Sequence, residues 1–232
     1  MTFDLRLVTP DYDLPNYDTP SGRFYKVPDG SYVPSVTTKL GKYFDKSEVL
    51  TKWRERVGDA EADKITRQGI ARGEALHKVV EKYILGEDWK TGTGHHTKEH
   101  FRKIKKDLDD NIDIVYGVEL PLYNMSMQTA GRTDLVCNFQ GIPTVLDNKT
   151  SRYDPPVEWI TNYFVQATCY ADMLNQFEFG IPKIEQIAIL MACDFGPRCL
   201  WVKKITSGMI EATRKIMIST DIAVPEELCV SK

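Results

Sequence analysis

The sequence lacks the cysteine pairs that hold a metal or a disulfide framework. Its five cysteines are odd in number, widely spaced and without any C-x-x-C pair. Neither a disulfide scaffold nor a zinc knuckle is therefore indicated. We expect reduced thiols that lie mostly in the core.

Long apolar runs are also missing. No stretch approaches the roughly 20 apolar residues that a membrane-spanning helix needs, and the N-terminal stretch is acidic and has no apolar signal-peptide core. No P-loop pattern is present, so no nucleotide cofactor is indicated. We expect a cytoplasmic protein that does not bind a membrane.

An excess of positive charge is absent as well. The net charge is −3, from 30 Lys and Arg against 33 Asp and Glu. This balance gives no global signature of nucleic-acid binding, but it leaves room for a local basic channel. With 232 residues, 42% of them hydrophobic, the chain is typical of one soluble domain spanning residues 1–232.

Hydrophobic periodicity and turn residues predict a mixed α/β fold. Residues 1–45 are expected to form an N-terminal arm followed by a hairpin. The expected helices cover residues 46–66, 68–86, 157–175 and 207–219, and the expected strands cover 113–123, 131–139, 142–151, 186–192 and 199–204. Together they predict a central mixed β-sheet flanked by helices.

The hairpin at residues 131–151 carries the most informative polar residues. Strand alternation places Asp147 and Lys149 on one face of the second strand, and the turn at Gln140-Gly141 brings Asp134 beside them. Two carboxylates and an ammonium in an apolar hairpin need mutual pairing or a metal ion. Carboxylates favour Mg²⁺, and the lysine can stabilise charge on a phosphate. The alternative is a structural ion pair of Asp147 with Lys149 or Arg132.

A histidine on the second helix is a further candidate. His77 borders the apolar stripe formed by Leu76, Val79 and Val80, and Glu81 lies one turn later on the same side. It is either a metal ligand or a packed, hydrogen-bonded core residue.

Two other segments suit phosphates or bases. Ser35 and Thr37 precede a helix and can hold a phosphate through neutral donors or act as its N-cap. The helix after Pro156 carries an aromatic and amide face that suits base stacking or the core, formed by Trp159, Tyr163, Gln166 and Tyr170.

Residues 87–110 combine a Gly-containing loop with a basic helix and can form a lid over the site. The basic run can equally be a solvated face. His95 and His96 lack the i, i+4 spacing of a zinc pair, which favours a solvated loop.

Four motifs in order resemble those of the PD-(D/E)XK nuclease superfamily. They are PSVTTKL at 34–40, G-x-x-x-H at 73–77, G-R-x-D with D-x-K-T-S in the hairpin, and Q-x-x-x-Y at 166–170. Within the superfamily the chain is similar to the RecB-type branch, including the mitochondrial genome maintenance exonuclease and related phage exonucleases. The resemblance implies a restriction-endonuclease-like core, and the cytoplasm of a phage host is a plausible location.

The resemblance also implies roles for individual residues. His77, Asp134, Asp147 and the carbonyl of Asn148 would bind Mg²⁺ or Mn²⁺, and Lys149 would be the catalytic lysine. The DNA contacts would come from Ser35, Thr37, Thr150, Ser151, Gln166 and Tyr170. Glu81 and Glu119 would have supporting roles, and no iron–sulfur cluster is expected because the cysteines of that subtype are missing.

The expected activity is hydrolysis of DNA, preferably single-stranded DNA with a free end, by a metal-activated water. Two alternatives stay open. One is an endonuclease of the same superfamily that cuts flaps or junctions, and the other is a non-catalytic DNA-binding recombination accessory protein.

Overall fold

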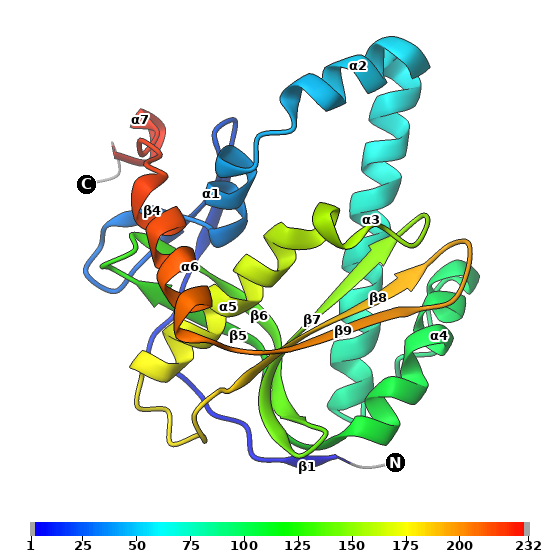
Figure 1. Ribbon diagram of the computed structural model, residues 1–232, viewed down its shortest axis with the longest axis vertical. Helices are drawn as coiled ribbons and strands as arrows, with labels where there is room; N and C mark the ends of the chain where they lie inside the picture. Colours follow the sequence, from blue (N-terminus) through cyan, green and yellow to red (C-terminus); the bar gives the residue numbers. More distant parts are fainter. Residues whose placement is uncertain (1–2, 230–232) are drawn as a thin grey trace.

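The central sheet of the computed structural model, which describes residues 3–229, has six strands in the order β1-β5-β6-β7-β8-β9 (Figure 1). The pairs β5–β6, β6–β7 and β8–β9 are antiparallel, whereas β1–β5 and β7–β8 are parallel. The strands are β1 Asp4–Leu5, β5 Ile112–Asn124, β6 Thr129–Phe139, β7 Ile142–Ser151, β8 Gln186–Cys193 and β9 Cys199–Lys204. The predicted mixed sheet is confirmed.

Helices cover both faces of this sheet. One face carries α1 (Val36–Tyr43), α5 (Thr161–Gln176) and α6 (Ser207–Ser219), and the other carries α3 (Asp59–Ile84) and α4 (His95–Asn111). Because strand side chains alternate, Val145 packs with the first group and Leu146 with the second. The remaining elements are α2 Ser47–Val57, the 3₁₀ turn η1 Val157–Ile160, α7 Glu226–Cys229, and a small sheet of β2 Asn16–Thr19, β3 Gly22–Lys26 and β4 Tyr32–Pro34.

The central hairpin forms as the alternation predicts. Phe139 pairs with Ile142 across a two-residue turn, in which Gln140 and Gly141 adopt φ of 55° and 76°. Positive φ at both central residues gives a turn whose twist matches the strands on either side. The register that follows brings the acidic residues of β6 and β7 to the same face.

The predicted boundary between the first two long helices is wrong. The chain breaks at Gly58, where φ is 83° and ψ is 146°, and α3 then continues through Gly69 without interruption. A backbone with these angles strongly favours glycine, whereas a glycine inside a helix costs only about 1 kcal/mol. As a result, α2 and the first half of α3 project from the body as an arch (Figure 1).

The segment around His95 also differs from the prediction. His95 and His96 lie in the first turn of α4 and not in a loop. Phe101, Ile104 and Leu108 on the same helix are completely buried against the sheet. This packing makes α4 part of the core, which contradicts a lid over the whole of residues 87–110.

Four cysteines, Cys137, Cys169, Cys193 and Cys199, are buried free thiols, as predicted, and the side chain of Cys229 lies outside the described set. The single domain predicted for residues 1–232 also extends beyond the described residues. Within those residues, no helix has the length and apolar character needed to cross a membrane.

Candidate active site

The candidate site lies where β6 and β7 part. Their ladder ends at the pair Leu135 and Leu146. One residue further on, the Oδ2 atom of Asp134 accepts a hydrogen bond of 2.7 Å from the backbone N–H of Asn148. The carboxylate thus takes the place of a strand-to-strand hydrogen bond and is fixed between the two strands.

Asp147 and Lys149 face the same point from β7. Lys149 Nζ donates a 2.8 Å hydrogen bond to Asp147 Oδ1 and lies 2.6 Å from Oδ2, which it approaches off the hydrogen-bond direction. Burial raises the pKa of Asp147 to about 6, although the Lys149 charge acts against this shift. Burial acts to lower the pKa of Lys149, but Asp147 and Asp134 outweigh it and raise that pKa above its ordinary value. Lys149 is therefore a cation at neutral pH.

His77 reaches the site from α3, on the other side of the sheet. Its Nε2 atom lies 2.8 Å from the carbonyl oxygen of Asn148. Because a carbonyl only accepts hydrogen bonds, Nε2 is the donor in this contact, and Nδ1 is the ring nitrogen that faces the carboxylates. Nδ1 lies 3.5 Å from Asp134 Oδ1 and 3.9 Å from Glu119 Oε1. A ring nitrogen and two carboxylates that lie this close together can share a proton or a cation.

Glu119 is held in the site by an unusual backbone. Its φ is 48°, a left-handed conformation that is rare outside glycine, on a strand that is otherwise extended. Burial raises the pKa of Glu119 to about 7, and the negative charge of Asp134 adds to the shift. Sequence reasoning gave Glu119 only a supporting role because a left-handed residue cannot be read from strand alternation.

The donor set fits a hard divalent cation. The carboxylates of Asp134 and Asp147 act on the Lys149 ammonium, and the carboxylates of Asp134 and Glu119 lie beside His77, so three carboxyl groups gather around one point of the sheet. His77, Glu119 and Asp134 each offer one ligand atom within 4.8 Å of the others. Carboxylate and carbonyl oxygens with one imidazole suit Mg²⁺ or Mn²⁺. Glu81 stays at the margin, where it pairs with Lys78 at 2.8 Å.

The predicted alternative of an ion pair also has geometric support. The Lys149–Asp147 pair is present, whereas Arg132 points to the backbone oxygen of Glu119 at 3.5 Å. Among the described residues, the Asp134 and Glu119 carboxylates form no salt bridge with a Lys or Arg side chain. Pairing within the protein therefore accounts for one of the carboxylates and not for the cluster.

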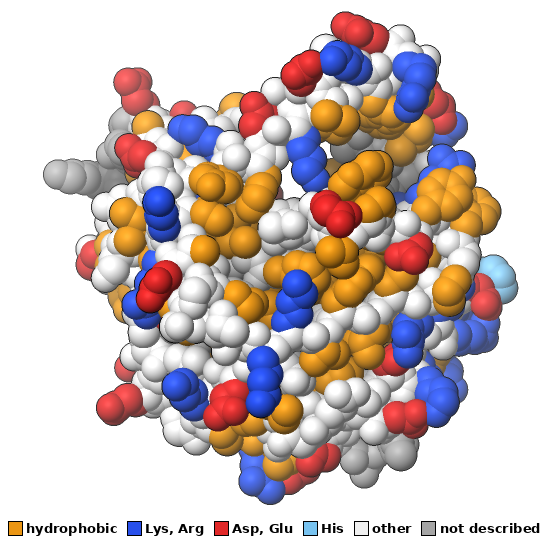
Figure 2. Space-filling model, viewed as in Figure 1, with side chains coloured by type: hydrophobic (Ala, Val, Ile, Leu, Met, Phe, Trp, Pro, Cys, Tyr) orange, Lys and Arg blue, Asp and Glu red, His pale blue; other side chains and the backbone are white. Residues whose placement is uncertain are grey.

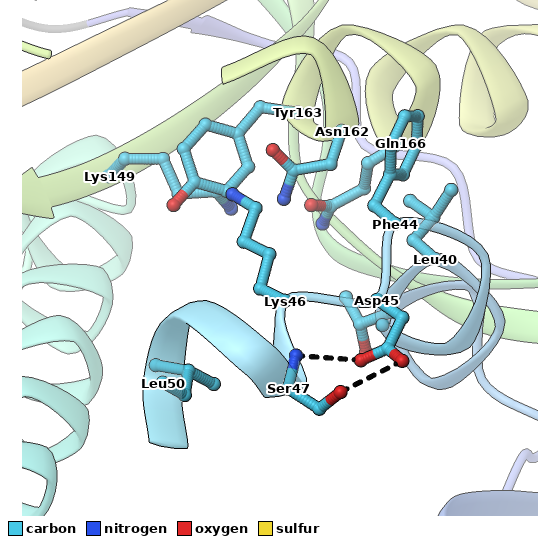
Figure 3. Close-up of a pocket in the computed structure, with 12 residues that line it drawn as sticks. Leu40, Phe44, Asp45, Lys46, Ser47, Leu50, Lys149, Asn162, Tyr163 and Gln166 are labelled. Carbon is cyan, nitrogen blue, oxygen red and sulfur yellow. Dashed lines mark hydrogen bonds between the residues drawn. The ribbon is translucent and has the colours of Figure 1, made fainter. Parts of the chain in front are cut away.

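A cavity of about 500 Å³ opens beside Lys149, between α5 and the segment that joins α1 to α2 (Figure 3). Thr37, Tyr163 and Gln166, which the sequence predicts as DNA contacts, line it. Lys149 Nζ lies 5.1 Å from the centre of the Tyr163 ring, so the Lys149 side of the cavity adjoins its aromatic side.

Two residues that sequence reasoning missed line the same cavity. Lys46 extends across it toward Tyr163, and its Nζ lies 3.4 Å from the backbone oxygen of Trp159 (Figure 3). Asn162 faces the cavity from the first turn of α5. Neither residue belongs to a pattern, because their approach depends on how α1, α2 and α5 pack.

Other predicted contacts have structural roles. Ser35 is buried and caps α1, where its Oγ accepts from Thr38 N at 2.9 Å, so the capping alternative is confirmed for this residue. Tyr170 is buried against Gly131, where an added Cβ would lie 2.5 Å from the tyrosine hydroxyl. Only glycine fits there, which explains the start of the G-R-x-D motif.

The remaining predicted DNA contacts lie at the surface or at the end of β7. The Trp159 side chain is 68% exposed. Thr150 and Ser151 are partly exposed, and Ser151 Oγ donates to the backbone oxygen of Tyr153 at 2.7 Å.

Comparison with known proteins gives distant relatives. No family model matches the chain. It is 26% identical over 188 residues to an ATP-dependent helicase/nuclease subunit of Streptococcus pneumoniae, in several strains, and to the exonuclease/helicase protein RexA of serotype 4 of the same species. Each match covers 79% of this chain but only 14% of the relative, so the chain spans about a seventh of the length of these proteins.

Among solved structures, the chain resembles a protein from Eubacterium rectale that is provisionally described as an exonuclease. The TM-score is 0.45 and the sequence identity is 12%, with 63% of this chain and 64% of the other covered.

Proposed function

We propose that this chain is a metal-dependent deoxyribonuclease of the PD-(D/E)XK superfamily, in its RecB-type branch, with a restriction-endonuclease-like core. The observation that carries the proposal is the meeting of Asp134, Asp147 and Lys149 with His77 where β6 and β7 part. The distant relatives add support, because their names include nuclease or exonuclease.

The metal in this proposal is Mg²⁺ or Mn²⁺, held by His77, Asp134, Asp147 and the carbonyl oxygen of Asn148, with Glu119 beside them. When bound, such an ion lowers the pKa of water and offsets phosphate charge. Asp147 holds the Lys149 ammonium in place. Lys149 in turn orients the attacking water and stabilises the negative charge that develops on the phosphate.

The substrate in this proposal is single-stranded DNA with a free end. Exposed aromatic side chains near the site support it, because unpaired bases stack on such rings. Tyr153 and Phe195 stack with ring centres 5.3 Å apart, and the Arg152 guanidinium lies within 5.8 Å of both ring centres. Trp159 and Tyr163 continue this aromatic surface along η1 and α5.

The arch of α2 and α3 supports the preference for a free end. Figure 2 shows a hollow beneath α2, with hydrophobic and basic side chains around it. Leu50 of α2 and Lys46 immediately before α2 line the cavity that contains Lys149. A single strand that enters beneath the arch meets Lys149, and duplex DNA or a closed circle enters less easily. The path favours action from a free end over cleavage of a closed circle.

The substitution Lys149→Ala tests the chemistry. It removes the ammonium that stabilises the transition state, so the rate of strand degradation should fall by about 10²–10³-fold while the Kd for single-stranded DNA stays close to that of the wild type. Cleavage of a labelled strand in excess Mg²⁺ measures the rate, and binding in the presence of Ca²⁺ measures the Kd.

Lys215→Ala is the matched control, because it removes one exposed positive charge from α6, away from the cavity. Its rate should equal that of the wild type. Degradation by Lys149→Ala at the wild-type rate would contradict the mechanism, and strand binding without a metal-dependent product in the wild type would favour a non-catalytic accessory protein.

A further inference from the structure

A second cluster of possible metal ligands lies outside the candidate active site. His96 and His100 are one helical turn apart on α4, and both face Asp194, which follows β8. Asp194 Oδ1 lies 3.4 Å from His96 Nε2 and 2.7 Å from His100 Nε2. Figure 1 shows the β8–β9 connection beside the start of α4, where these residues meet.

The distances approach those of a tetrahedral site. Zinc bonds of roughly 2.0–2.2 Å to nitrogen and oxygen place neighbouring ligand atoms about 3.3 Å apart. The His96–Asp194 distance of 3.4 Å already has this value. The His100–Asp194 contact is a hydrogen bond, which has to open by about 0.6 Å for an ion to enter. Histidines at i and i+4 project from one side of a helix, as in known zinc pairs.

Asp194 is held in place by groups around it. Arg72 Nη1 binds its Oδ2 at 2.8 Å, which leaves Oδ1 to face the histidines. Its backbone N–H donates to Ser151 O at 2.9 Å, and Lys103 Nζ binds its backbone oxygen at 3.1 Å. The carboxylate therefore needs little reorganisation to act as a ligand, and Arg72 supports it in the manner of an outer-shell partner.

The two histidines differ in exposure: His100 is buried and His96 is exposed. The His100 side chain is 2% exposed, and its buried Nδ1 has no hydrogen-bond partner. The contact of the His100 ring with Asp194 is therefore made by its Nε2 atom. His96 is 67% exposed. Solvent next to His96 leaves a fourth position open to water.

We propose that His96, His100 and Asp194 form a site for Zn²⁺ or another divalent cation that prefers imidazole, separate from the proposed catalytic site. Two imidazoles and one carboxylate favour such ions over Mg²⁺, which prefers oxygen ligands. The bound ion links α4 to the turn after β8, and through Asp194 to the end of β7 at Ser151. Its effect is to stabilise the structure beside the active site.

Zinc titration of the untagged full chain tests the proposal, with a chromophoric chelator as competitor and excess Mg²⁺ present. His96→Ala should weaken one zinc site by more than the roughly 10–100-fold that loss of an outer-shell partner costs. His95→Ala is the matched control, because it removes the adjacent exposed histidine, which is not part of the cluster. The control should retain wild-type affinity.

Two further measurements complete the test. Co²⁺ should give tetrahedral absorption bands with the wild type and His95→Ala, and Zn²⁺ should raise the Tm of these two proteins but not of His96→Ala. Any zinc bound at the proposed catalytic site is common to all three proteins, so this result does not depend on nuclease activity. Equal zinc affinity and equal Tm shifts for His96→Ala and the wild type would overturn the proposal. Because His96 is exposed, its substitution leaves the fold intact even if that of buried His100 does not.

Discussion

At the scale of single residues, the site depends on the orientation of His77. The carbonyl oxygen of Asn148 fixes its Nε2, and this contact joins residues 71 positions apart in the chain. The backbone N–H of the same residue, Asn148, donates to the carboxylate of Asp134 and fixes it. One residue of β7 therefore aligns side chains from α3 and β6 through its backbone N–H and carbonyl groups.

His77→Ala tests this arrangement. Loss of a ligand should shift the Mn²⁺ concentration for half-maximal cleavage upward by at least about tenfold, since even the loss of an outer-shell partner costs roughly 10–100-fold in metal affinity. The measurement is the cleavage rate of a labelled single strand across a Mn²⁺ titration. Glu74→Ala, an exposed acid one turn earlier on α3, is the control. An unchanged activation curve for His77→Ala would argue against ligation.

Some of these residues could be predicted from the sequence, and others could not. Asp134, Asp147 and Lys149 follow from period-two alternation around a short turn, because register in a hairpin is set locally. Glu119 enters the site through a left-handed backbone, and Lys46 through the packing of three helices. Both depend on tertiary structure, which overrides local pattern.

At the scale of elements, two glycines with similar surroundings in the sequence have opposite effects. Gly58 ends α2 with a positive φ, whereas Gly69 lies inside α3. Placing the break at Gly69 was wrong because composition alone does not show which glycine needs the unusual backbone. The strands β5 to β9 and α6 were predicted closely, since turn and capping residues mark their ends, whereas β1 was not predicted.

Substitution of these two glycines by alanine should separate their roles. Gly58→Ala forces a side chain into a strained backbone and should lower the free energy of unfolding by about 1–3 kcal/mol. Gly69→Ala brings the new Cβ to 3.9 Å from Arg72 Nη2, an ordinary van der Waals contact, and should raise the free energy of unfolding by about 0.5–1 kcal/mol. Denaturant unfolding of both variants measures the difference. Equal effects of the two substitutions would mean that the helix boundary lies elsewhere.

At the scale of the whole molecule, the chemistry and the path of the substrate come from different layers. The carboxylates and Lys149 lie in the sheet, His77 comes from α3 on one face, and the cavity is closed by α5 and the arch on the other. Alternation and periodicity predict the layers. The arch could not be predicted, because α2 contains no buried residue whose pattern shows what it faces.

The most direct test of the proposed function compares linear and circular single-stranded DNA of the same sequence in one time course, with Mg²⁺ or with EDTA. A strand that must enter beneath the arch by a free end and is cut by a metal-dependent site gives rapid loss of the linear DNA in Mg²⁺, little loss of the circle, and no product in EDTA. Digestion of the circle as fast as the linear strand would contradict the need for a free end, and product formation in EDTA would contradict the metal-dependent site.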